Sequence, residues 1–326
     1  PHSERRRCGA RCAMIVIESL DQIGAAERGS VGALGNFDGV HRGHRAVIER
    51  TRAIAESAGA PVSVITFEPH PRSLFQADAP LFRLTDAAGR AEALAELGVD
   101  ILFQIPFDQT FSLLSAEDFI DQILHHGLGL RHVVIGYDFH FGRRRRGTPE
   151  MMLEHAAALG FGATRVDAVH EADGAIYSST RIRQCLSEGD PRGAAALLGR
   201  PWSFEAAVES GDQRGRQLGF PTANLRIENR VQPAAGVYAV YAAERAEDGA
   251  LGSWMAGVAN YGRRPTVNDR GKLFEVHLLD QSRDLYGKTL KIQLIDFIRP
   301  ETKFDGLDAL RAQIAADSAR ARELLG

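Results

Sequence analysis

The sequence has little cysteine, no long apolar run and no strong net charge. Its three cysteines, Cys8, Cys12 and Cys185, form neither a disulfide framework nor a zinc-binding spacing, which predicts a reducing, cytoplasmic location. No apolar stretch approaches the ~18 residues that a membrane-spanning helix needs. A net charge of −3 gives no general basic field for nucleic acid. We therefore expect a cytoplasmic protein whose partners are neither membranes nor nucleic acids.

Both the length of 326 residues and a change of pattern along the chain predict two domains. Residues 1–13 show no periodicity and are treated as an extension outside the fold. Residues 14–187 alternate β-branched strands with helices, which is typical of an α/β domain with a doubly wound parallel sheet. Residues 188–200 read as a connector. Residues 201–326 carry successive strands and a last helix, which predicts an antiparallel β-barrel with a closing helix.

Individual segments follow this division. In the first half we predict strands at residues 31–37, 62–67, 101–107, 132–136 and 163–169, and helices at 45–58, 86–97, 116–125 and 149–160. In the second half we predict strands at residues 204–208, 237–242, 254–259, 273–279 and 290–295, with the closing helix presenting Leu307, Leu310, Ile314, Leu324 and Leu325. The carboxyl ends of parallel strands meet at one sheet edge, where ligands of such folds bind.

A glycine-rich loop joins the first predicted strand to its helix. A helix N-terminus offers free N–H groups that suit phosphate, and glycines let a ligand approach the backbone. Two histidines three residues apart meet on one helix face. The spacing matches neither a P-loop nor a dinucleotide fingerprint. We predict phosphate contacts here, with a solvated polar helix cap as the alternative; the candidates are Gly35, Asn36, Phe37, Asp38, His41 and His44.

Unusual residues also follow three other predicted strands. Aromatic rings offer faces for a flat ligand, and hydroxyls with an arginine at a helix start can hold phosphates. The candidates are Phe67, Pro69, Pro71 and Phe75 after the second strand, Asp138 and Phe141 after the fourth, and Ser179, Thr180 and Arg183 after the fifth. Turn formation, core packing and helix capping are the plain alternatives. Four arginines at residues 143–146 read first as a solvated loop, with polyphosphate or RNA contact as the alternatives.

Two features stand out in the second half. Glycines recur every four residues at Gly211, Gly215 and Gly219, around Arg216, and suit a flap over a nucleotide. Thr222 and Asn224 lie one residue apart and carry oxygens that fit Mg²⁺. A turn-rich hairpin without ligand is the alternative. Glu275 interrupts an apolar strand, so it either faces an opening or has an ion-pair partner.

Six segments together resemble one enzyme family, the bifunctional riboflavin kinase/FMN adenylyltransferases or prokaryotic FAD synthetases. They are residues 35–44, 66–72, 136–142, 178–183, 215–224 and 274–280, in that order, and the resemblance covers residues 14–326. It implies an FMN adenylyltransferase domain followed by a riboflavin kinase barrel. Riboflavin, FMN and ATP are then the substrates, FAD is the product and Mg²⁺ the metal.

The resemblance also implies roles for the candidate residues. Glu275 matches the catalytic glutamate of the family motif, with Thr222 and Asn224 holding Mg²⁺ and Gly211, Gly215, Arg216 and Gly219 contacting ATP of the kinase. His41 and His44 then serve adenylyl transfer, and the residues after the second and fourth strands bind flavin. The chain departs from the family at Tyr261, where a smaller residue is usual, and in the run of arginines.

Two other functions are weighed against this one. A flavin- or nucleotide-binding regulatory protein would keep the fold, but it would need neither the two histidines nor Thr222, Asn224 and Glu275. A nucleotidyltransferase acting on RNA or another small phosphate would share the first loop, but the aromatic residues favour a flat ring. Whether the chain associates with itself is left open.

Overall fold

A computed structural model describes residues 13–75, 82–170, 174–209, 220–263, 272–281, 283 and 285–326. The chain forms two compact units. The first comprises the described residues of Pro1–Ala79 and Ala87–Tyr177, and the second those of Pro80–Asp86 and Ser178–Gly326. The division falls at Tyr177, before the predicted connector. The functional boundaries at residues 187 and 200 stay a prediction.

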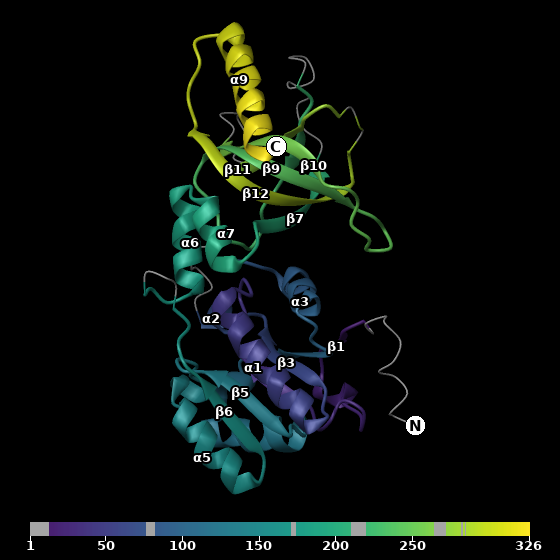
Figure 1. The fold of residues 1–326 in the computed structure, drawn as a ribbon, viewed down its shortest axis with the longest axis vertical. Helices are drawn as coiled ribbons and strands as arrows, with labels where there is room; N and C mark the ends of the chain where they lie inside the picture. Colours follow the sequence, from purple (N-terminus) through teal and green to yellow (C-terminus); the bar gives the residue numbers. More distant parts are fainter. Residues whose placement is uncertain are drawn as a thin grey trace. The chain divides into compact units, whose positions relative to one another are not determined.

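The first unit is built on a six-stranded parallel sheet, as the sequence predicts (Figure 1). Its strand order is β1-β4-β3-β2-β5-β6. The order reverses direction at β2, which lies between β3 and β5, so β2 is where a ligand crevice is expected in such a sheet. The five predicted strands are present, and β1 is an additional edge strand. Their bounds are β1 Ile15–Ile17, β2 Val31–Leu34, β3 Val62–Glu68, β4 Ile101–Pro106, β5 His132–Gly136 and β6 Gly162–Val166.

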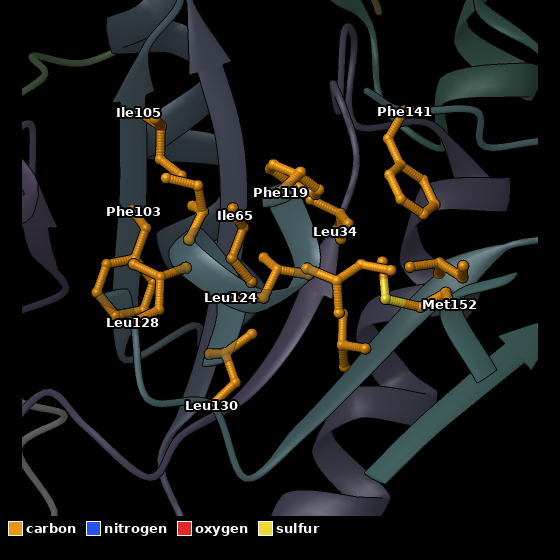
Figure 2. Close-up of a cluster of buried hydrophobic side chains, with 14 of the residues drawn as sticks. Leu34, Ile65, Phe103, Ile105, Phe119, Leu124, Leu128, Leu130, Phe141 and Met152 are labelled. Atoms are coloured by element: carbon orange, nitrogen blue, oxygen red, sulfur yellow. The ribbon is translucent and has the colours of Figure 1, made fainter. Parts of the chain in front are cut away.

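Helices cover both faces of this sheet. Val47 and Ile48 of α1 and Leu94 of α3 belong to the core cluster on one face. Phe119 and Met152 belong to the cluster on the other face, part of which Figure 2 shows. The helical elements are η1 Leu20–Gln22, α1 Arg42–Ala58, α2 Pro71–Phe75, α3 Ala87–Glu96, η2 Phe111–Leu113, α4 Ala116–Asp118, η3 Phe119–Gly127, η4 Arg143–Arg145 and α5 Pro149–Leu159.

Of two helices predicted in this unit, one is confirmed and the other has a different hydrogen-bonding pattern. The helix expected at residues 149–160 is confirmed as α5: Thr148 accepts from the Met151 N–H, and Gly160 ends it in the left-handed region. The helix expected at residues 116–125 is only a short α-turn followed by the π-helix η3. Periodicity marks the buried face of such a segment but does not distinguish the two kinds of helical hydrogen bonding.

The second unit contains a closed six-stranded barrel of order β10-β11-β8-β7-β12-β9, which confirms the predicted architecture. All its pairings are antiparallel. The five predicted strands are present, and the three-residue β8 is additional. Their bounds are β7 Trp202–Glu209, β8 Ala223–Leu225, β9 Gly236–Arg245, β10 Met255–Arg263, β11 Lys272–Leu278 and β12 Thr289–Pro300.

A short segment from the first half of the sequence completes the second unit. The Trp202 indole N–H donates to the Leu84 carbonyl at 2.9 Å, and the Val231 N–H donates to the Arg83 carbonyl at 2.8 Å. Arg230 also pairs with Asp86. Helices α6 Ser179–Glu188 and α7 Pro191–Leu198 belong to this unit as well, so its fold begins before the barrel strands.

The closing helix α9, Leu307–Leu325, packs beside the barrel. Figure 1 shows it beside β9 and β10. Ala321 is fully buried in that contact, while Leu307, which was expected on the apolar face, is 66% exposed. The strongest polar contact of the helix is an ion pair in which Arg299 of β12 donates to both carboxylate oxygens of Asp317. Asp317 is nearly buried, so this pair fixes the helix position.

We predict that Asp317→Ala lowers the free energy of unfolding of the second unit by about 2–4 kcal/mol, because it leaves the mostly buried Arg299 without its carboxylate. Arg322→Ala breaks the exposed pair with Asp280 and is the matched control, expected to cost less than about 1 kcal/mol. Both tryptophans lie in this unit, so fluorescence during urea denaturation reports its unfolding. If the two variants lose equal amounts of unfolding free energy, the anchoring role of Asp317 is contradicted.

Candidate functional sites

The loop after β2 ends in a histidine that caps helix α1. His41 has extended backbone angles, and its Nδ1 atom accepts a hydrogen bond from the His44 N–H at 3.3 Å. Accepting through Nδ1 puts the proton of the neutral ring on Nε2, which is then the donor atom of the ring. The His44 ring stacks on the His41 ring, with centroids 3.6 Å apart and planes 18° apart. The structure thus brings the two predicted histidines together at a helix N-terminus.

Gly43 lies against the His41 ring, where there is little room for a side chain. A Cβ atom on Gly43 would lie 3.1 Å from Cε1 and Nδ1 of His41, so the His41 ring rests on the bare backbone. Gly39 has φ +86°, in the left-handed region that glycine adopts without strain. The glycines between and before the histidines therefore serve ring packing and loop conformation.

Most of this loop is buried rather than open. Phe37 is 1% exposed, has φ +50° and contacts the His44 ring at 5.1 Å. Asp38 is also buried, and the Asn36 carbonyl accepts from the Thr66 hydroxyl at 3.1 Å. A Cβ atom on Gly35 would lie 3.2 Å from the Phe37 ring, so a glycine at this position leaves room for that ring. These buried loop residues pack around the histidine pair. Of the two histidines, His44 is half-buried and His41 is buried.

Phenylalanine rings gather at the carboxyl ends of β3, β4 and β5. Phe67 lies 5.7 Å from Phe107 and 6.1 Å from Phe119 between ring centroids. Phe119 in turn lies 5.5 Å from Phe141, and Phe75 lies 6.3 Å from Phe107. The predicted residues Phe67, Phe75 and Phe141 therefore belong to one ring cluster, which is linked by Phe107 and Phe119.

Burial divides the predicted flat-ring contacts into two sets. Phe67 and Phe141 are each 5% exposed and form part of the core. Phe75 is 67% exposed, Pro69 and Asp138 are exposed, and Pro71 is half-buried. The exposed set offers the surface for a ligand, and the buried pair lies behind it.

Sequence reasoning missed Phe107 and Phe111, which are half-buried members of the same cluster. A signal for them was present, because both follow β4 and strands of a parallel sheet end at a common edge. The four arginines nearby are exposed, in a loop whose ends are joined by the bridge between Phe141 and Gly147. Arg144 and Arg145 both have φ +57°.

Helix α6 carries the remaining candidates of the first half. Ser178, not Ser179, is its N-cap and accepts from the Arg181 N–H at 3.4 Å. Arg183 donates through Nε to the Phe82 carbonyl at 2.6 Å, and its guanidinium lies 5.5 Å from the Phe82 ring centre. Ser179, Thr180 and Arg183 belong to the second compact unit, and their phosphate contacts stay a prediction.

In the barrel, strand register aligns three polar residues. Glu275 of β11 lies opposite Asn224 of β8 on one side and Asn260 of β10 on the other. Paired residues of antiparallel strands project to the same sheet face. The preceding residue, Phe274, points into the barrel, where it stacks on Tyr261 with centroids 4.4 Å apart. The polar row therefore lies on the outer face, and Asn260 is a member that sequence reasoning missed.

His277 fixes the segment that leads to Asn224. Its Nδ1 atom lies 2.9 Å from the Pro221 carbonyl, and its ring meets the Phe220 ring edge-on at 5.4 Å. His277 shares a strand face with Glu275. Thr222 follows Pro221 directly and is half-buried, whereas Asn224 is 4% exposed. The predicted flap residues Gly211, Gly215, Arg216 and Gly219 lie outside the described residues.

Tyr261, one of the departures from the family pattern, is a core residue. It is 1% exposed inside the barrel, and burial raises the pKa of its phenol to about 12. Its neighbour Tyr238 donates to the Ala234 carbonyl, and burial raises the pKa of that phenol too. Tyr261 thus fills barrel volume on the face opposite the polar row.

Among the described residues, no helix is long and apolar enough to cross a membrane. The same residues contain no group of three or more His, Cys, Asp or Glu side chains that can hold a metal ion.

Helix α1, capped by a histidine, begins after the central strand β2 of a parallel sheet, and the same chain carries a barrel with a row of polar side chains. Together these features define a two-domain nucleotide-dependent transferase. Family models agree with this class: FAD synthetase matches residues 24–181, and riboflavin kinase matches residues 198–325. The chain belongs to the bifunctional riboflavin kinase/FMN adenylyltransferase family, with its FAD synthetase domain first and its riboflavin kinase domain second. The resemblance drawn from the six motifs is confirmed.

Its relatives match over almost their full length. The bifunctional riboflavin kinase/FMN adenylyltransferase of Escherichia coli (strain K12) is 40% identical, over 95% of this chain and 96% of that protein. The protein of that name from Pseudomonas fluorescens is 42% identical, over 95% and 98%. A crystal structure described as a macrolide-efflux protein from Streptococcus pneumoniae has a TM-score of 0.82 and 30% identity, over 95% of this chain and 99% of that one.

We predict that Gly43→Ala slows FMN adenylylation by about tenfold, because the new Cβ displaces the His41 ring from its packed position. Alanine is favoured over glycine inside a helix by about 1 kcal/mol, so thermal stability should not fall in parallel. Riboflavin phosphorylation by the same protein is the internal control. An unchanged adenylylation rate would show that the ring position is unimportant.

Proposed function

We propose that the two activities of the family, riboflavin kinase and FMN adenylyltransferase, reside in this chain in two separate sites. The kinase site is the polar row of Asn224, Glu275 and Asn260 with Thr222. The adenylyltransferase site is the His41–His44 pair together with the exposed part of the phenylalanine cluster. The observation that carries the proposal is the β8–β11 register, which sets Glu275 opposite Asn224. That pairing joins a carboxylate to a candidate metal ligand.

In adenylyl transfer, a phosphate oxygen of FMN attacks the α-phosphorus of ATP, and the bond to the departing pyrophosphate breaks. The nucleophile is already ionised, so the protein needs to align the phosphates and to neutralise the growing charge. His41 can donate from Nε2, because Nδ1 accepts the helix-cap hydrogen bond. His44 lies against it at the same helix end.

The flavin ring is proposed to bind on the exposed side of the phenylalanine cluster. Phe75 supplies an exposed ring, and Pro69, Pro71 and Asp138 are proposed as further flavin contacts. Phe67 and Phe141 act from behind, by holding the cluster together.

In the kinase site, the ribityl hydroxyl of riboflavin attacks the γ-phosphorus of ATP, and ADP leaves. Glu275 is proposed to orient that hydroxyl and to accept its proton as the new bond forms. Thr222 and Asn224 would hold Mg²⁺, which when bound neutralises charge on the ATP phosphates. The His277 contact with the Pro221 carbonyl holds the start of this segment.

A cytoplasmic location is also proposed. Cys185 is a free cysteine in the structure, and the sequence has no disulfide framework, both of which support a reducing compartment. Self-association is untested and stays open.

Replacing His44 tests the first site. His44→Ala should slow conversion of FMN to FAD by about a hundredfold, because it removes one positioned donor at the helix N-terminus. Riboflavin phosphorylation should change little. His155→Ala on α5 is the control histidine. If both activities of a folded His44→Ala protein fall together, the assignment of His44 to adenylyl transfer is wrong.

Replacing Glu275 by its neutral isostere tests the second site. Glu275→Gln keeps the shape of the side chain but cannot take a proton, so riboflavin phosphorylation should fall by roughly a hundredfold or more. Binding of riboflavin and conversion of supplied FMN to FAD should be nearly unchanged. Glu323→Gln on α9 is the exposed control. A Glu275→Gln protein that melts earlier yet keeps full turnover when folded would make Glu275 a structural residue.

A further inference from the structure

Arg90 of α3 is an unusual residue, because it is an arginine only 1% exposed to solvent. Its Nη2 atom donates to Oε2 of Glu68 at 2.9 Å and to Oε1 of Gln104 at 3.1 Å. Gln104 donates in turn to Glu18 at 3.1 Å. Burying a guanidinium costs much solvation energy, which only well-placed acceptors offset. The acceptors here come from the segments around the ends of three neighbouring strands.

Glu68 is the residue on which this network acts most directly. It is the last residue of β3 and immediately precedes Pro69. Its carbonyl accepts from the Phe107 N–H at 2.9 Å, and its carboxylate is held by Arg90. Glu68 is therefore fixed through both its main chain and its side chain.

The segment after Glu68 leads directly into the proposed flavin contacts. His70 accepts through Nδ1 from the Arg72 N–H at 3.1 Å, which starts the single turn of helix α2. Phe75 ends that turn and is largely exposed. Because Glu68 is bonded directly to Pro69, its position sets the point from which the chain runs to Pro69, Pro71 and Phe75.

We propose that Arg90 is a positioning residue for FMN: by fixing Glu68, it sets the place of the loop formed by Pro69, Pro71 and Phe75. The inference rests on the proposed function, in which these residues receive the flavin ring. Arg90 lies behind the loop and acts only through Glu68. The rival account makes the pair purely structural, important for stability but not for flavin affinity.

The variants are Arg90→Met, Arg90→Lys and Glu68→Gln. Arg90→Met should raise the KM for FMN in adenylylation by about tenfold, with the KM for ATP little changed, because the loop is proposed to contact the flavin and not ATP. Arg90→Lys keeps the positive charge but loses the planar guanidinium with its several N–H donors. Its affinity for FMN should therefore lie between those of Arg90→Met and the unchanged protein. Glu68→Gln should raise the KM for FMN as well, and the double variant Arg90→Met/Glu68→Gln should be no worse than Arg90→Met.

Two controls separate the accounts. Arg165→Met breaks an Arg–Glu pair of similar length, 2.8 Å to Glu150, that is exposed and far from this loop in sequence. It should leave the KM for FMN unchanged. Riboflavin phosphorylation, measured on each variant, reports on the other site of the same molecule. Should Arg90→Met fail to fold, Arg90→Lys and Glu68→Gln carry the test.

Phe75→Ala distinguishes a failure of this inference from a failure of the proposed flavin site. If Phe75→Ala raises the KM for FMN but Arg90→Lys and Glu68→Gln lower only the melting temperature, the positioning role is overturned and the site stands. If Phe75→Ala leaves the KM for FMN unchanged, the flavin site is wrongly placed and the inference falls with it. A rise in the KM for FMN in all of these variants, with Arg165→Met unchanged, supports both.

Discussion

The hydrogen bond from the His44 N–H to Nδ1 of His41 is the interaction on which the first site depends. It ends the loop after β2, starts helix α1 and leaves the ring proton of His41 on Nε2. Gly43 lies against the His41 ring, and Phe37 packs against the His44 ring. Buried loop residues thus hold one donor geometry at a helix N-terminus, where phosphate binding is already favoured.

In the second unit, strand pairing positions the polar residues of the proposed kinase site. In a barrel, alternate residues point inward and outward, so the register that stacks Phe274 on Tyr261 inside also aligns Asn224, Glu275 and Asn260 outside. A one-residue slip would exchange the two rows. Aromatic packing within the barrel therefore fixes the polar row that we assign to the kinase.

The sequence predicted what local patterns determine and missed what long-range contacts determine. Thr148 and Gly160 marked the ends of α5 correctly, because capping is a local interaction. Strand β8 was missed because three residues are too few for a periodicity, and the row through Asn224 depends on that strand. The contact of Arg90 with Glu68, 22 positions away, has no local signal in the sequence, so it appears only in the structure.

The central claim is that the two transfers occur in separate sites of one chain. The most direct test supplies riboflavin and MgATP to an equimolar mixture of the Glu275→Gln and His44→Ala proteins. Neither protein alone should make appreciable FAD from riboflavin, because each lacks one step. The mixture should make it, since FMN formed by the His44→Ala protein can be adenylylated by its Glu275→Gln companion. If the mixture makes no more FAD than the two proteins separately, the claim of two independent sites is contradicted.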